Sequence, residues 1–157
     1  MSWIKDGLKT TQDNDERDRL AAERQLHIAK VRKAKARDLL DRITAAATAA
    51  IEEYRAATTG QDKRRVDYSE KPSGGFKLYK PYYPAASVEI SLDTTVDVLR
   101  VERSFTPSSN ARVQAIQSTL QLQVDDQDDL WVVLESGQTA GPEETVKQLL
   151  TSVLFAA

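Results

Sequence analysis

The chain has 157 residues, of which 40% are hydrophobic and 29% are charged, and this composition suits one globular domain of ordinary size. It contains no cysteine and one histidine, which excludes disulfides, thiolate nucleophiles, Cys-based metal sites and zinc sites made of several histidines. No motif supports the acid–base, serine or lysine chemistry that remains. We therefore expect a protein that is not an enzyme and that needs no cofactor.

The charges are distributed unevenly along the chain. Residues 1–71 carry 16 Lys and Arg against 13 Asp and Glu, whereas residues 72–157 carry 6 against 11. The N-terminal part is thus basic and the C-terminal part acidic, so we expect a weak attraction between them. A basic segment also attracts anionic partners without a folded pocket.

The ends of the chain lack the patterns of export or membrane insertion. Lys5 and Asp6 interrupt the N-terminal residues, which leaves no continuous apolar segment for a secretory signal. The uncharged run over residues 148–157 is shorter than the roughly 20 apolar residues that cross a bilayer. We expect a cytoplasmic protein without a membrane span.

Residues 12–57 contain no Gly or Pro and are rich in good helix formers, which predicts a long helix that occupies the segment 1–57. Over residues 39–57 the apolar side chains follow one stripe, as expected for a helix packed on a core. This stripe consists of Leu39, Ile43, Ala46, Ala47, Ala50 and Tyr54, with Leu40 and Ile51 at its border.

The first part of this helix, residues 1–37, is expected to project from the core because its apolar stripe is thin. An isolated helix of this kind is marginal in water, so we expect another chain to cover the stripe, either a partner protein or a second copy in a coiled coil. A short apolar patch at the N-terminus adds to this surface. The candidate partner-binding residues are Trp3, Ile4, Leu8, Leu20, Ile28 and Val31.

After the helix the sequence predicts a linker and then a sheet. Residues 58–75 are polar and contain Gly and Pro, which indicates a linker. Residues 76–157 are predicted to form an antiparallel β-meander of four to five strands with a C-terminal helix packed on it. The fold class is therefore α+β.

Three details of this region follow from its periodicity. Apolar and polar residues alternate without a break over 116–124, which predicts one strand, and an apolar run predicts a last strand over 130–135. Val96 and Val101 fall in opposite phases, which predicts a β-bulge near Val98. Pro142, followed by two glutamates, is typical of the first turn of a helix.

A second surface suggests nucleic-acid binding. Aromatic residues alternate with lysines in the segment 76–84, where exposed rings could stack on bases. A basic stripe on the long helix and a basic run in the linker are typical of phosphate recognition, with an affinity that falls steeply as salt rises. The candidate residues are Lys30, Lys33, Arg37, Lys63, Arg64, Arg65, Tyr79, Tyr82 and Tyr83.

Two features that resemble chemical sites are interpreted as structural. The acidic run over residues 125–129 lacks the glycine and the terminal glutamate of a calcium loop, so we interpret it as a polar hairpin turn and predict no metal site. His27 has no nucleophile motif beside it and is interpreted as a surface residue of the helix.

The leading hypothesis is a non-enzymatic assembly or adaptor subunit that binds a protein partner, or a second copy of itself, through the N-terminal helix. The alternative is nucleic-acid binding through the basic and tyrosine residues named above. A third possibility is a small apolar ligand between the sheet and the C-terminal helix. A fully packed interior at Leu120, Leu122, Trp131 and Leu150 would exclude such a ligand.

Overall fold

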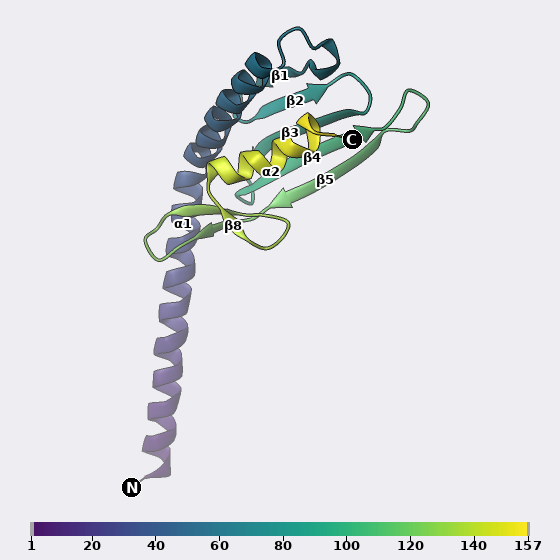
Figure 1. The fold of residues 1–157 in the computed structure, drawn as a ribbon. Coiled ribbons are helices and arrows are strands. Elements are labelled where there is room, and N and C mark those ends of the chain that lie inside the picture. The colour runs from purple at the N-terminus through teal and green to yellow at the C-terminus, as the bar shows by residue number, and fades with distance from the viewer. Residues whose placement is uncertain (1, 157) are drawn as a thin grey trace.

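The computed structural model describes residues 2–156 and shows a long helix, two antiparallel sheets and a closing helix (Figure 1). The α+β class predicted from the sequence is confirmed. The hydrophobic core lies between one face of the larger sheet, the C-terminal half of the long helix and the closing helix.

The long helix α1 spans Trp3–Ala57 as one element of 55 residues and continues without interruption through Gly7. Its buried face differs from the predicted stripe, since Leu40 and Ile51 lie at its centre whereas Ala46 and Ala50 are only partly buried. The reason is that two elements cover the helix: the sheet side takes the large residues, and the closing helix approaches the alanines. The buried residues are Ala36, Leu39, Leu40, Ile43, Thr44, Ala47, Ile51 and Tyr54.

The larger sheet has five strands in the order β1-β2-β3-β4-β5, each antiparallel to its neighbour, as expected for a meander. Large apolar residues on its inner face, such as Phe76, Val88 and Leu99, are completely buried. The strands are β1 (Asp67–Glu70), β2 (Phe76–Lys80), β3 (Ala85–Asp93), β4 (Val98–Thr106) and β5 (Gln114–Leu120).

Two predictions about these strands are wrong. Residues 58–75 are not only a linker, because they contain a short 3-10 helix η1 (Asp62–Arg64) and the edge strand β1. No bulge occurs near Val98, because β3 and β4 pair without an extra residue down to Asp93 opposite Val98. Val96 is out of phase because it lies exposed in the turn between the two strands.

The strand predicted over residues 116–124 is divided between two sheets. Strand β5 ends at Leu120, and after Gln121 the chain continues as strand β6 (Leu122–Val124) of the second sheet. The carbonyl of Gln121 accepts a hydrogen bond of 2.8 Å from the amide of Val133. The second sheet has the order β6-β7-β8, with β7 at Leu130–Val133 and β8 at Thr139–Ala140. The predicted last strand therefore belongs to this smaller sheet, and alternation alone does not reveal the change of sheet.

The closing helix α2 spans Pro142–Leu154 and begins with proline in its first turn, as predicted. Its apolar face packs on α1, β2 and β3. The buried residues of this helix are Thr145, Val146, Leu149, Leu150, Val153 and Leu154. Among the described residues, neither helix has a stretch long and apolar enough to span a bilayer.

Candidate functional site

The first part of α1, residues 3–23, extends away from both sheets and is called the stem below (Figure 1). Every described residue from Ser2 to His27 is exposed, and 81% of the surface of Trp3 is accessible to solvent. The side-chain hydrogen bonds of the stem join residues of the stem itself, such as that of 2.7 Å between Arg19 and Glu23. Ile4, Leu8 and Leu20 are the large apolar residues that it leaves exposed besides Trp3.

The helix residues that follow the stem, 24–37, are called the base of the stem, and they contact the turn between β6 and β7. This turn consists of residues 125–129 and is called the acidic turn. Arg24 contacts the Asp126 carboxylate at 3.3 Å, and His27 Nε2 lies 3.0 Å from the Asp128 carboxylate. Lys35 Nζ donates to the backbone carbonyl of Asp128 at 2.5 Å. The acidic run is therefore a hairpin turn, as predicted, and its charges are complementary to the basic helix.

Ile28 and Val31 are half-buried beside this contact, so the chain itself covers the part of the apolar stripe that was expected to need a second chain. Arg32 adds a hydrogen bond beside this contact, because its Nε donates to the Leu122 carbonyl at 3.0 Å. The sequence predicted a weak attraction between the basic and acidic parts of the chain but not this contact, because the acidic turn lies about a hundred residues after the helical residues that it meets. Leu26, which the predicted stripe omits, is exposed instead.

Asp125 organises the acidic turn through hydrogen bonds. Its carboxylate accepts hydrogen bonds from the Trp131 indole at 2.8 Å and from the backbone amides of Gln127 and Asp129 at 2.9 and 2.8 Å. The Trp131 hydrogen bond, followed by those of the amides, lowers the pKa of Asp125. These three hydrogen bonds fix the shape of the turn.

The basic stripe predicted for nucleic-acid binding lies on the side of α1 that faces away from the acidic turn. Lys30 and Lys33 are exposed. Arg37 is engaged by its own helix, since its Nε lies 3.3 Å from the Asp41 carboxylate. Its guanidinium also packs against Gly74, just before the start of β2.

The other predicted nucleic-acid residues gather at the opposite end of β2. Asp67 pairs with Tyr79, so Arg65 lies beside the end of β2, where the loop with Tyr82 and Tyr83 begins. Burial, followed by repulsion from nearby Arg64, lowers the pKa of Lys80. These residues therefore make one basic and aromatic cluster at this end of the sheet, with exposed tyrosine rings, and Lys63 precedes Arg64 in η1.

The two halves of the predicted nucleic-acid surface do not form one site. Arg37 and the end of α1 at Ala57 are about 30 Å apart along the helix axis, given its rise per residue. The basic linker and the tyrosines lie near that end, whereas Lys30 and Lys33 lie beyond Arg37 on the other side. Lys30 and Lys33 are therefore separated from the tyrosines, whereas Arg37 reaches Gly74 at the other end of β2.

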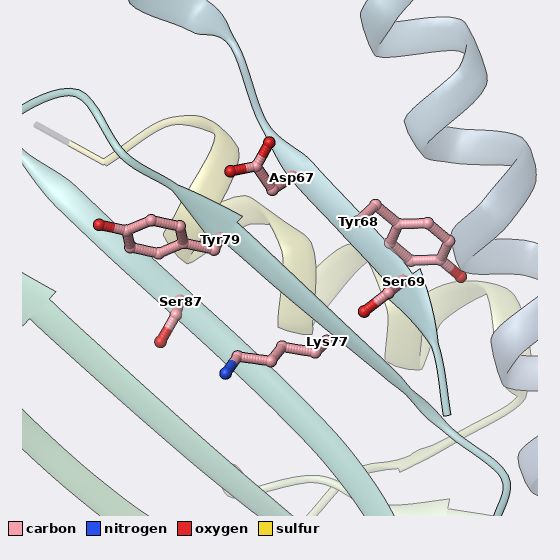
Figure 2. A pocket seen from close by; sticks show the side chains of 6 residues that line it. All are labelled: Asp67, Tyr68, Ser69, Lys77, Tyr79 and Ser87. Carbon is pink, nitrogen blue, oxygen red and sulfur yellow. The ribbon is translucent and has the colours of Figure 1, made fainter. Parts of the chain in front are cut away.

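A shallow depression of about 430 Å³ lies on the outer face of the sheet, opposite the core. Figure 2 shows Asp67, Tyr79, Lys77 and Ser87 lining it from β1, β2 and β3. Tyr68 borders it, but its hydroxyl lies 2.8 Å from Thr48 Oγ1 on α1, and burial raises its pKa. No hydrogen bond joins the described side chains within the depression to one another, so they show none of the paired geometry that activates a nucleophile.

The interior offers little support for a small apolar ligand beneath the sheet. Leu120, Leu122 and Leu150 are buried within one core cluster. Trp131, expected in that interior, is instead 38% exposed, because its indole faces the acidic turn. The apolar groove beside α2 lies between α2 and α1 and is open to solvent.

Among residues 2–156, no group of three or more His, Asp or Glu side chains is placed to hold a metal ion. Comparison with known proteins finds no matching family model, no matching curated protein and no matching solved structure.

Proposed function

We propose that this protein is a non-enzymatic assembly subunit that binds a second protein chain through its stem. One observation carries the proposal: residues 3–23 form a continuous helix on which every side chain is exposed. Isolated helices are marginal in water because tertiary packing supplies most of their stability. A helix with exposed Trp3, Ile4, Leu8 and Leu20 gains that packing when another chain covers it.

The rest of the molecule supports this role by holding the stem in one direction. The C-terminal half of α1 is part of the core, and the acidic turn contacts the helix again at Arg24, His27 and Lys35. The stem thus continues a helix that is fixed at two places, in the core and at the acidic turn. The whole of α1 is about 80 Å long. A partner that binds the stem is held at a defined distance from the sheets.

The test compares the wild-type protein with the double variant Ile4→Ser/Leu8→Ser by light scattering after size-exclusion chromatography, at low and high salt. The emission of Trp3, obtained as the difference between the spectra of the protein and of its Trp3→Phe variant, moves to shorter wavelength when the stem is covered, and Trp131 stays in place to hold the acidic turn. Removing two exposed apolar side chains should weaken binding about 10- to 100-fold. Val96→Ser, which alters an exposed apolar residue far from the stem, is the control.

A salt-resistant oligomer that the double variant dissociates identifies the partner as a second copy. If the pure protein is monomeric, a photo-crosslinking residue at Gln12 is used in the cells that make the protein, with Thr95 as the control position. An adduct of discrete mass that depends on Ile4 and Leu8 then identifies a foreign partner. The proposal would be contradicted if Ile4→Ser/Leu8→Ser changed neither the Trp3 emission nor the crosslinking.

A second candidate function is favoured by the cluster of Arg64, Arg65, Tyr79, Tyr82 and Tyr83. Cations beside exposed aromatic rings bind single-stranded nucleic acid by stacking and counterion release. In a binding titration with a fluorescent oligonucleotide, Arg64→Glu/Arg65→Glu should abolish a salt-sensitive affinity, whereas Lys30→Glu/Lys33→Glu should leave most of it. Equal effects of the two double variants would argue against a binding site at this cluster.

A further inference from the structure

Strand β5 forms an edge of the larger sheet and carries no charge. Its neighbour on one side is β4, and in the order of the described strands none follows it on the other side. Figure 1 shows β5 along the margin of the sheet opposite β1. From Val113 to Val124 the chain has no charged residue, no proline and no glycine. Val113 and Ile116 are 64% and 63% exposed.

The opposite edge of the same sheet is protected. Strand β1 has four residues, two of them the acids Asp67 and Glu70, and Pro72 follows it closely. Its Tyr68 and Glu70 also contact Thr48 of α1. Short length, charge and proline are the means by which proteins prevent edge strands from pairing with other chains. Strand β5 is longer, with seven residues, and itself contains neither a charge nor a proline; charged groups near it include Arg112, two residues before it, and Glu135, whose carboxylate accepts a hydrogen bond of 3.4 Å from Ser118.

We infer that β5 pairs in antiparallel fashion with β5 of a second copy, so that the two five-stranded sheets join into one. The occupant follows from charge: an uncharged strand meets its own copy without the repulsion that like charges would cause across a two-fold axis. The same strand has no charge with which to select a foreign peptide. A two-fold axis at Gln117, the central residue, places all seven residues opposite a partner residue.

This pairing satisfies groups that are otherwise left to water. In antiparallel sheets alternate residues direct both N–H and C=O outward, so two copies of a seven-residue strand close about six to eight inter-strand hydrogen bonds. Ile116, on the inner face, then lies opposite Ser118 and loses exposed apolar surface. The interface does not involve the stem, so it stands or falls independently of the proposed function.

The first experiment uses the absence of cysteine. Gln117→Cys introduces a single thiol, and the two-fold axis places the two Cα atoms about 4.5–5.5 Å apart, within the range that a disulfide bridges. Mild oxidation with a copper catalyst and oxygen should convert most of the protein into a covalent dimer. The control, Gln148→Cys on the exposed face of α2, should give little dimer under the same conditions.

The second experiment uses charge. Gln117→Lys and Gln117→Glu, each alone, should be monomeric by light scattering, because like charges then face each other, and an equimolar mixture should be dimeric. Gln148→Lys, with the same change of net charge, and the stem variant Ile4→Ser/Leu8→Ser should keep the β5 dimer. The wild-type protein should be dimeric at about 100 µM, a concentration at which even a weak specific dimer is populated. A monomer at this concentration would overturn the inference. Gln117→Lys that stays dimeric, or a mixture that stays monomeric, would overturn it as well.

Discussion

Gly75 shows how one residue allows the inner strands to meet. It follows the turn after β1 with φ of +88°, a region that L side chains rarely adopt. A Cβ atom added there would lie 2.0 Å from the backbone carbonyl oxygen of Ile90. Phe76 pairs with Ile90, so the close approach belongs to the register of β2 and β3. Glycine at this position is therefore required both by the backbone angle and by the neighbouring strand.

We predict that Gly75→Ala strongly destabilises the protein. The left-handed backbone alone costs about 1–3 kcal/mol for a residue with a Cβ atom, and the clash with Ile90 adds to this. Urea unfolding followed by circular dichroism measures the loss. Gly137→Ala is the matched control, because Gly137 has φ of +87° with no atom within 4 Å of the added Cβ. Equal losses for the two variants would show that the contact with Ile90 is unimportant.

At the scale of elements, the contact between the acidic turn and α1 depends on the shape of the turn. Asp125 holds that shape through Trp131 and two backbone amides. Because these hydrogen bonds lower the folded-state pKa of Asp125, the stability it contributes is present above the unfolded pKa, near 4, and is lost as the pH falls through the folded-state value.

We predict that Asp125→Asn lowers the melting temperature at pH 6 and that this difference shrinks as the pH falls below the unfolded pKa, near 4, because protonation removes the wild-type carboxylate. The same variant should increase amide hydrogen exchange over residues 24–35, which the turn contacts, and leave residues 39–54 unchanged. Calorimetry and hydrogen exchange measure the two effects. Asp126→Asn is the control, since its carboxylate contacts Arg24 but not the turn backbone. A pH-independent difference for Asp125→Asn would contradict this role.

At the scale of the whole molecule, the described chain divides at the base of the stem rather than at residue 37. Residues 3–23 bury no side chain, whereas residues 24–37 contact the acidic turn and include the buried Ala36. The boundary predicted from apolar periodicity is therefore too far along the helix. Contacts made by charged and backbone groups, which periodicity does not report, account for the difference.

We predict that deleting residues 1–23 leaves the melting temperature and the cooperativity of unfolding nearly unchanged, because no core contact is lost. Deleting residues 1–37 should lower the melting temperature by several degrees, since about 1–2 kcal/mol of contacts with the acidic turn disappears. Differential scanning calorimetry measures both. Equal melting temperatures for the two deletions would show that the acidic turn does not stabilise the helix.

Elements with their own periodicity could be predicted from the sequence. Residues 12–57 lack helix breakers, Pro142 begins a helix with a single apolar face, and the alternation around Val88 indicates a strand with one buried face. These local patterns suffice for the α+β class and the meander. The candidate stem also follows from the sequence, because Trp3, Ile4 and Leu8 stand on a charged helix that offers them no local cover.

Long-range contacts were decided by the tertiary structure alone. Strand β1 has four residues and one half-buried tyrosine, too few for a pattern, and it forms because β2 offers an edge. The alternation over 116–124 continues through Gln121 although the strand changes sheets there, since Leu120 and Leu122 face the same core. The cover of Ile28 and the separation of Lys30 from Tyr79 depend on which segments meet in space. Sequence periodicity determined the two helices and the long inner strands, whereas packing between distant segments determined β1, the division of β5 from β6 and which surfaces remain free.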